Sequence, residues 1–418
     1  MMKHAWILNH YALAPSDAGG TRHYSLAAHL RSYGWDATII AASVEHNSNR
    51  QRLAAAERQR HEVLDGVPFL WLKTPGYKGN GVSRMCNMLA YTARALLPHS
   101  TGVLPRPDAI IGSSVHPFAA LAGAILARRH RVPFVFEVRD LWPQTLIDLG
   151  RLDERSPMTL LLRRLERMLY VEATRIVTLL PHAADYIEGL RVDRRKVVWI
   201  PNGVELSARD PAAPRLRGPG EPFVLMYFGA HGNANGLEHV VRAVGEAASR
   251  LPPGALRLRL IGDGPLKNDL KQLAASLRLD NVSFEPPVPK SAIPRLAAEA
   301  DAFVISVLDR PRLYKYGISM NKLFDYLAAE RPVLIASGAQ NNPIAEAGAG
   351  ISVPPADIDA LSNAIITIIR TPDEERHRMG RAGRHFVESH HSFGHLAARL
   401  AHTLDACTNE TAATAQHA

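Results

Sequence analysis

The sequence predicts an α/β protein with two doubly wound domains, because two series of alternating segments follow each other along its 418 residues. In each series, short apolar runs alternate with longer segments of helical periodicity. Several runs are apolar throughout, which is typical of strands buried on both faces of a parallel sheet. A chain of this length exceeds one compact core, so we expect two domains, at residues 1–206 and 223–390.

The first series supplies the elements of the N-terminal domain. We expect strands at His4–Asn9, Asp36–Ala41, Pro68–Leu72, Ala109–Gly112, Pro133–Val138, Ile176–Leu180 and Val197–Ile200. Between them, helical periodicity predicts helices at Thr21–Tyr33, Val82–Leu97, Pro117–Arg129 and Met158–Val171. Strands that alternate with helices in this way indicate a mostly parallel sheet covered by helices.

A linker at residues 207–222, rich in proline and without hydrophobic periodicity, separates the two series. The second series predicts strands at Phe223–Phe228, Leu256–Ile261, Val282–Glu285, Ala302–Val307, Val333–Ala336 and Ile351–Val353. Helices are expected at Leu237–Leu251, Leu266–Ser276, Ile293–Ala300 and Ile358–Ile369. An amphipathic segment at 391–405 is expected to fold back on either domain. The small, polar residues 408–418 are expected to be disordered.

Composition narrows the class of protein. The chain is 46% hydrophobic and 21% charged, as is usual for a globular protein, and its two cysteines argue against a disulfide framework. No apolar stretch reaches the length of a membrane span, and the N-terminus indicates a first strand rather than a signal peptide. Most of the net charge of +9 lies in the first half. That charge suits an anionic lipid surface or nucleic acid, or is a plain arginine-rich surface. Nucleic-acid binding does not account for the paired sheets.

The segment Lys315–Leu334 carries the strongest site signal. A loop leads into a helix that stops before Pro332, and backbone N–H groups at a helix start bind phosphate well. Lys322 and Asp325 fall on roughly the same helix face, since they are three residues apart. A cation for a diphosphate and a carboxylate for sugar hydroxyls suit a nucleotide-sugar site. The alternative is an ordinary helix and strand with two solvated charges.

Three loops that follow predicted strands are rich in glycine. The first contains Gly19 and Gly20, with Thr21 as a candidate helix cap. The second runs from Phe228 to Leu237 and carries Gly229, His231, Gly232, Asn233 and Asn235. The third is Gly262-Asp263-Gly264, where Asp263 is a candidate cap. Each loop suits a phosphate contact through backbone N–H groups, and each is also compatible with a simple turn.

Two further loops place polar side chains at strand ends, where doubly wound sheets bind ligands. His116 follows one strand and is expected to position a substrate, unless it is a plain loop histidine. Arg139 and Asp140 follow the next and suit acceptor binding or an internal ion pair. Trp142 suits stacking on a sugar ring or burial in the core.

Some patterns are better explained by structure than by chemistry. Asp357-Ile-Asp359 resembles a metal-binding motif, but it opens a helix, so we expect Asp357 to be a cap. His390, His391, His395 and His402 have no acidic or cysteine partner that would indicate a metal site. The basic segment Arg155–Tyr170 suits either a membrane surface or a docked helix with solvated arginines.

Six motifs in order make the chain resemble the retaining glycosyltransferases of family 4. They are Gly19–Tyr24, Val138–Pro143, Ile200–Gly203, Tyr227–Gly236, Ile261–Gly264 and Lys315–Leu334. The likeness is strongest to the bacterial branch that builds O-antigen and capsule sugars, including N-acetyl-L-fucosamine transferases. It implies a GT-B fold, in which two Rossmann-like domains face each other across a cleft.

The resemblance also implies roles for residues. The C-terminal domain would hold the nucleotide sugar and the N-terminal domain the acceptor, with no metal or other cofactor. Asp325 matches the glutamate that binds the ribose diol, whereas Gly317 stands where the family has its first glutamate. The family's Arg and Lys after the linker are also missing, so Lys322 is expected to be the main diphosphate cation. The catalytic set is then His116, Lys322 and Asp325.

The remaining site residues fall into two groups. Arg139, Asp140 and Trp142 would bind the acceptor. The donor would contact Gly19, Gly20, Gly229, His231, Gly232, Asn233, Asn235, Asp263, Gly264, Val288, Gly317, Ile318, Ser319, Met320 and Asn321.

The expected reaction moves a sugar from a UDP-sugar to an undecaprenyl-diphosphate-linked saccharide, with retention of anomeric configuration. The expected location is the cytoplasm, peripheral at the inner face of an anionic plasma membrane. Nucleic acid is not an expected partner. Two alternatives stay open. One is a nucleotide-sugar 2-epimerase on the same fold, and the other is a non-catalytic nucleotide-sugar-binding subunit.

Overall fold

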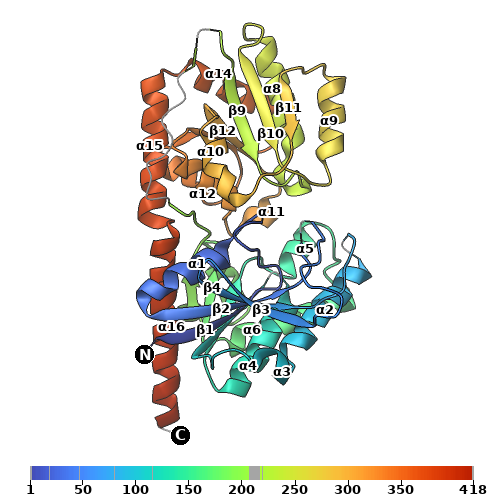
Figure 1. Ribbon diagram of the computed structural model, residues 1–418. Coiled ribbons are helices and arrows are strands. Elements are labelled where there is room, and N and C mark those ends of the chain that lie inside the picture. Colours follow the sequence, from blue (N-terminus) through green and yellow to red (C-terminus); the bar gives the residue numbers. More distant parts are fainter. Residues whose placement is uncertain are drawn as a thin grey trace. The chain divides into compact units, whose positions relative to one another are not determined.

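The computed structural model describes residues 2–17, 19–46, 48–79, 81–114, 116–206, 217–218 and 220–416 (Figure 1). The chain forms two compact units. Unit 1 comprises Met1–Pro201 and Phe393–Ala418, and unit 2 comprises Asn202–Ser392. Residues 207–216 and 219 of the expected linker lie outside the described residues.

The described strands of unit 1 form an eight-stranded sheet in the order β3-β4-β2-β1-β5-β6-β7-β8. Within this sheet, every neighbouring pair is parallel except β3 and β4. The strands are β1 (Lys3–Leu8), β2 (Trp35–Ala42), β3 (Gln59–Leu64), β4 (Val67–Leu72), β5 (Ala109–Ser113), β6 (Phe134–Val138), β7 (Arg175–Thr178) and β8 (Val197–Trp199).

Helices cover this sheet. They are α1 (Arg22–Leu30), α2 (Val82–Ala95), α3 (Pro98–Thr101), α4 (Pro117–His130), α5 (Gln144–Asp148), α6 (Pro157–Glu172), α7 (Ala183–Gly189) and α16 (Phe393–Gln416). The central strands β1, β5 and β6 are buried almost throughout, which explains their continuous apolar sequence. One core cluster joins α1 and α16 to the sheet through residues such as Leu26, Leu396 and Leu400 (Figure 1).

Unit 2 contains a six-stranded, wholly parallel sheet among its described residues, in the order β11-β10-β9-β12-β13-β14. Its strands are β9 (Phe223–Phe228), β10 (Leu256–Ile261), β11 (Val282–Glu285), β12 (Ala302–Ser306), β13 (Val333–Ala336) and β14 (Gly350–Val353). Its helices are α8 (Leu237–Ser249), α9 (Lys267–Ser276), α10 (Ile293–Ala297), α11 (Pro311–Tyr314), α12 (Asn321–Ala328), α13 (Pro343–Ala347), α14 (Ile358–Arg370) and α15 (Asp373–His390). Core clusters lie on both faces of this sheet.

The predicted fold class, two doubly wound α/β domains, is confirmed. Asp357 caps α14 as expected, since its carboxylate accepts a hydrogen bond from the Ala360 N–H at 2.8 Å. In contrast, the predicted Thr21 cap is wrong. Thr21 occupies the N-cap position of α1, but its side chain makes no capping hydrogen bond.

Besides several short helices, β3, α15 and the end of α16 differ from expectation. β3 was not predicted, because it pairs at an edge and most of its side chains are polar. α15 was not predicted either, because charged residues dominate its sequence. The expected disorder of 408–418 is wrong for 408–416, which continue α16, a stretch whose alanines favour a helix although its threonines do not. No helix among the described residues is both long and apolar enough to cross a bilayer.

The core of unit 1 depends on α16, and this dependence can be tested at Leu404. This side chain is fully buried against unit 1. Leu404→Ala is expected to lower the free energy of unfolding by about 2–5 kcal/mol, through lost burial and the cavity it leaves. Urea unfolding of the full chain measures this loss. The control is His402→Ala on the exposed face of α16, which is expected to change stability by less than about 0.5 kcal/mol. Equal effects of the two variants would contradict this packing.

Candidate active site

Lys322 is the central cation of unit 2. Its ammonium lies 2.7 Å from the Tyr227 hydroxyl and 2.5 Å from the Asn235 side-chain oxygen, and 4.5 Å from the centre of the Tyr227 ring. No carboxylate among the described residues forms an ion pair with it. Removal from water lowers the pKa of Lys322 to about 7. A desolvated cation held only by neutral groups is suited to an anionic ligand.

Glycines let two loops pack backbone against backbone beside Lys322. A Cβ on Gly262 would lie 1.9 Å from the Gly229 carbonyl oxygen, and one on Gly264 would lie 2.5 Å from the His231 carbonyl oxygen. The N–H groups of Gly229 and His231 donate across the same contact, to Ile261 at 2.9 Å and to Asp263 at 2.8 Å. These glycines therefore fix the loop that carries Asn235.

Asp263 does not cap α9, contrary to expectation. The helix begins at Lys267, and its N-cap residue is Leu266. The exposed Asp263 carboxylate instead accepts a hydrogen bond from the Gly264 N–H at 2.8 Å. Asp263 thus stabilises the turn between the strand and the helix.

His231 is fully buried, and neither of its ring nitrogens has a hydrogen-bond partner among the described residues. Burial, reinforced by Lys267 and Lys322, lowers its pKa to about 4, so the ring is neutral near pH 7. An unpartnered buried imidazole is costly, and a ligand would relieve that cost. Because the nitrogens are covered, a ligand reaches them only if this loop shifts.

In the loop before α12, fewer backbone N–H groups are free to bind an anion than the sequence suggested. The N–H of Gly317 donates to Tyr314 at 3.0 Å, and that of Ile318 donates to the Asn341 side chain at 2.7 Å. These two groups are thus engaged within the protein. Among the described residues, no acceptor faces the backbone N–H groups of Ser319, Met320 and Asn321. The anion-binding end of α12 therefore begins at Ser319.

Asp325, the expected ribose ligand, is buried and paired with a residue that the sequence did not single out. Lys290 lies 2.6 Å from both carboxylate oxygens. Burial raises the pKa of Asp325, and Lys290 counteracts that shift. Lys290 follows β11 at the carboxyl end of the sheet. That position after a predicted strand was the one sequence feature that could have marked Lys290 as a site residue. Nearby, the predicted Val288 is half-buried and packs against the core.

The other predicted residues of this region are placed as follows. Asn235 donates from its amide nitrogen to the Ala230 carbonyl at 2.9 Å, which orients its oxygen toward Lys322. Asn233 is exposed in the same loop, and Gly232 is half-buried. Unit 2 thus brings together Lys322, Asn235, His231 and the glycine loops.

In unit 1, His116 is a helix cap with no nitrogen to spare. Its Nδ1 accepts the Ala119 N–H at 3.3 Å, and its Nε2 lies 2.5 Å from Nδ1 of His10. Since Nδ1 accepts, the proton sits on Nε2 and is donated to His10. Burial lowers the pKa of His116 to about 3, and it is fully buried. The expected direct contact with a substrate is therefore not available in this conformation.

A stack of four rings rises from the core beside His116, and the sequence did not reveal it. Tyr91, His10, Tyr11 and His46 follow one another with centroid separations of 4.6, 4.3 and 4.4 Å. Arg84 donates to the Tyr11 hydroxyl at 2.9 Å. Tyr91 is fully buried, whereas His46 is exposed. The stack presents aromatic surface next to a cation, which suits a sugar ring near a phosphate.

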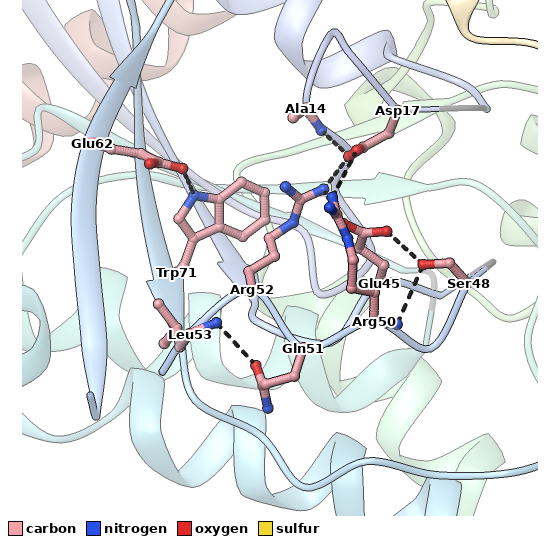
Figure 2. A network of polar contacts seen from close by, with 10 residues as sticks. All are labelled: Ala14, Asp17, Glu45, Ser48, Arg50, Gln51, Arg52, Leu53, Glu62 and Trp71. Carbon is pink, nitrogen blue, oxygen red and sulfur yellow. Dashed lines mark hydrogen bonds and ion pairs between the residues drawn. The ribbon is translucent and has the colours of Figure 1, made fainter. Parts of the chain in front are cut away.

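An ion network braces the loop that contains Gly19 and Gly20 (Figure 2). Asp17 accepts the Ala14 N–H at 2.7 Å and pairs with Arg52, which also lies 2.9 Å from Glu45. Arg52 stacks on Trp71 at 4.5 Å from the ring centre. Gly19 has φ +141°, which favours glycine. This network ties the segment before the glycine pair, through Asp17, to the loop after β2, which carries Glu45 and Arg52.

The loop after β6 carries the expected acceptor residues. The Arg139 N–H donates to the Ser114 hydroxyl at 3.1 Å, and Trp142 is half-buried. Arg139 and Asp140 form no ion pair with each other among the described contacts. The preceding Glu137 was not predicted. It accepts hydrogen bonds from Arg22 at 2.9 Å and His23 at 2.5 Å, and all three are buried.

Comparison with known proteins assigns both halves of the chain to glycosyltransferase domains. Residues 18–203 match the glycosyl transferase 4-like domain, and residues 222–371 match the glycosyl transferases group 1 domain. Together these matches cover most of the chain. The chain therefore belongs to the glycosyltransferases with the GT-B fold.

Two curated bacterial relatives are similar over part of their length. One is described as the colanic acid biosynthesis glycosyl transferase WcaI of Escherichia coli, 23% identical over 59% of this chain and 62% of its own. The other is described as the glycosyltransferase WbjE of Pseudomonas aeruginosa, 26% identical over 56% of this chain and 58% of its own. The chain thus spans about three fifths of the relatives it matches.

Solved structures share the fold at low sequence identity. A sucrose-phosphate synthase from Thermosynechococcus elongatus has a TM-score of 0.73 at 17% identity, over 95% of this chain and 97% of its own. A trehalose 6-phosphate synthase from Burkholderia multivorans gives 0.68 at 15%, over 100% and 99%. HepE from Anabaena, solved with UDP and glucose, gives 0.65 at 14%, over 97% and 100%.

The lowered pKa of Lys322 predicts a pH dependence for the binding of a nucleoside diphosphate such as UDP or GDP. In the free protein this pKa is about 7, and an adjacent diphosphate raises it. Binding therefore takes up a proton above pH 7, so affinity is expected to be flat below pH 7 and to fall about tenfold per unit above it. Calorimetry at pH 8 in two buffers of different ionisation enthalpy measures the uptake. Lys322→Gln is expected to abolish it, and an unchanged uptake in this variant would contradict the assignment.

Proposed function

We propose that this chain is a retaining, metal-independent glycosyltransferase that moves a sugar from a UDP-sugar to a lipid-linked saccharide. The observation that carries the proposal is the Lys322 ammonium, held by Tyr227 and Asn235 beside free N–H groups at the start of α12. A diphosphate leaving group gains negative charge as its bond to the sugar breaks. Such an arrangement stabilises that charge.

Several observations support a uridine donor and polysaccharide synthesis. HepE structures contain UDP and UDP-glucose, and a trehalose-6-phosphate protein from E. coli contains UDP-2-fluoro glucose. The curated relatives are described as glycosyltransferases, one of them of colanic acid biosynthesis. The resemblance to the O-antigen and capsule branch favours an N-acetylated deoxy sugar.

The proposed step uses same-face attack. The acceptor hydroxyl forms a bond to the anomeric carbon on the side from which the diphosphate departs. The bond from that carbon to the phosphate oxygen breaks, and the acceptor proton passes to a diphosphate oxygen. Lys322 neutralises the leaving diphosphate, and Asp325, oriented by Lys290, accepts hydrogen bonds from the ribose diol.

The acceptor is assigned to unit 1. The exposed His46 ring at the end of the stack offers stacking surface, and Arg84 on Tyr11 offers positive charge, for a phosphorylated saccharide. Trp142 is half-buried in the loop after β6 and offers a second platform. An undecaprenyl-diphosphate-linked sugar combines the ring and the phosphate that these groups suit.

We also propose peripheral contact with an anionic membrane through α6. Its exposed face carries large apolar side chains, namely Met158, Leu160, Leu161, Met168 and Val171. Arg164 and Arg167 are exposed on the same helix. Apolar side chains interleaved with arginine suit a bilayer surface, where they enter the acyl boundary beside anionic headgroups.

The non-catalytic subunit remains the competing function, because Gly317 has no side chain where the resembling family places a glutamate. A binding subunit would take up UDP-sugar without turnover. An assay with purified chain, UDP-sugars and a lipid-diphosphate acceptor decides between them. Turnover that requires the acceptor supports the transferase, and it also separates the transferase from an epimerase, which needs no acceptor.

Lys322→Met is the direct test of the donor site. The variant keeps the length of the side chain but loses a charge worth about 3–4 kcal/mol in the transition state, so kcat/KM is expected to fall by roughly 10²–10³-fold. Its thermal stability is expected to be unchanged or higher, because a desolvated cation has been removed. Lys271→Met, on the exposed face of α9, is the control and is expected to keep full activity. Full activity of Lys322→Met would contradict the proposed role of Lys322 in the donor site.

The membrane contact is tested by vesicle sedimentation. Leu160→Ser combined with Leu161→Ser is expected to weaken binding to vesicles containing phosphatidylglycerol at least about tenfold, because two exposed leucines no longer enter the bilayer. Leu277→Ser, an exposed leucine of unit 2, is the matched control. Binding that is unaffected by the double substitution would refute this role of α6.

A further inference from the structure

The polypeptide passes between the two units twice. It leaves unit 1 after Pro201 and returns at Phe393, so Asn202 and Ser392 are the terminal residues of unit 2. Any change in the relation of the units must be absorbed by backbone at these two crossings. The residues that contact these crossings therefore determine which other parts of each unit respond to such a change.

On the side of unit 1, the first crossing is held by a buried ion cluster. Arg22 donates to the Ile200 carbonyl at 2.9 Å and to the Pro201 carbonyl. The same guanidinium donates to Glu137 at 2.9 Å, and Glu137 also binds His23. Because Arg22 and Glu137 are buried and paired, they hold the last residues of unit 1 firmly.

On the side of unit 2, the same crossing is tied to the loop before α12. The Asn202 N–H donates to the Ser319 hydroxyl at 2.9 Å, and the Asn202 amide nitrogen donates to the Ser319 carbonyl at 2.5 Å. Asn202 is buried. Ser319 is also the first residue of this loop whose backbone N–H is free for an anion.

The second crossing rests on the same elements. The His391 ring stacks on Phe324 of α12, with centroids 4.4 Å apart. Its Nδ1 lies 3.3 Å from the Asn202 carbonyl oxygen, and its own carbonyl accepts the Val204 N–H at 3.0 Å. The residues at both crossings thus contact each other, and each contacts the donor loop or the helix that follows it.

We propose that Asn202 and His391 are positioning residues that couple occupancy of the donor loop to the two crossings. A diphosphate on the N–H groups from Ser319 onward pulls on a loop whose carbonyl and hydroxyl are bonded to Asn202. The displacement then reaches both crossings, while Arg22 holds the chain on the other side. This inference rests on the proposed donor site.

Asn341 provides a matched control, because it holds the same loop without touching a crossing. Its side chain accepts the Ile318 N–H at 2.7 Å and donates to the Ile318 carbonyl at 3.1 Å. Loss of Asn341 loosens the donor loop alone. Asn341→Ala removes both of these hydrogen bonds. Asn202→Ala removes one, the amide donation to the Ser319 carbonyl, because the Asn202 N–H is backbone, and this loss also loosens the tie to the crossing.

The test is a distance measurement by fluorescence transfer in the full chain. Cys86 of unit 1 is exposed and accepts one dye, Cys407 is buried, and Leu277→Cys supplies an exposed site in unit 2. Saturating UDP is expected to change the distance in the parent protein. With Asn341→Ala, UDP affinity falls, but the full change returns at saturation. With Asn202→Ala, at least half of the change is lost at saturation, and kcat falls about tenfold or more while KM changes less.

Ser319→Ala is the mild companion variant, since it removes only the hydroxyl acceptor of Asn202 and should leave folding intact. It is expected to lose part of the distance change. The inference is overturned if UDP binds but the parent shows no change, or if Asn202→Ala and Ser319→Ala both retain the full change and kcat. Failure of the parent to bind any nucleoside diphosphate is a different result, because it removes the proposed function itself.

Discussion

The donor half of this molecule depends on one desolvated charge. Lys322 sits among neutral groups, and the Tyr227 hydroxyl and the Asn235 amide oxygen accept two of its hydrogen bonds without neutralising its charge. Such a buried charge is unfavourable without a counter-ion. Binding of an anion removes this unfavourable free energy, which therefore contributes to affinity. Gly262 and Gly264 serve this arrangement, because only glycine lets their loop meet the loop after β9 closely enough to fix Asn235.

In unit 1, by contrast, several buried charged and imidazole groups are paired with one another. Glu137 binds both Arg22 and His23, and His116 and His10 share one proton while a helix N–H occupies the remaining nitrogen of His116. Paired groups of this kind make a scaffold rigid, and they need no ligand to satisfy their hydrogen bonds. The contrast explains why titration is expected to report on unit 2, although unit 1 holds most of the buried histidines.

Local sequence patterns predicted the two sheets and the loops at their strand ends, because apolar periodicity and glycine placement act over a few residues. Lys322 was found this way. Lys290, Glu137 and Arg84 were not found, because their hydrogen-bond partners lie between 35 and 115 residues away in sequence. Gly317 and Ile318 were expected to contact the nucleotide sugar, but their backbone N–H groups are engaged within the protein. Their acceptors come from Tyr314 and the distant Asn341, which only the folded loop brings into place.

The return of α16 to unit 1 has a consequence for synthesis on the ribosome. Unit 2 is continuous in sequence, so all of its strands have been made before α16 emerges. The core of unit 1, in contrast, lacks Leu396, Leu400 and Leu404 until α16 is made. The domain that begins first is therefore completed last, and its apolar face beside α1 stays open throughout translation of unit 2. That face can close only after α16 has been made, so the folding of unit 1 is tied to a segment that follows the whole of unit 2 in sequence.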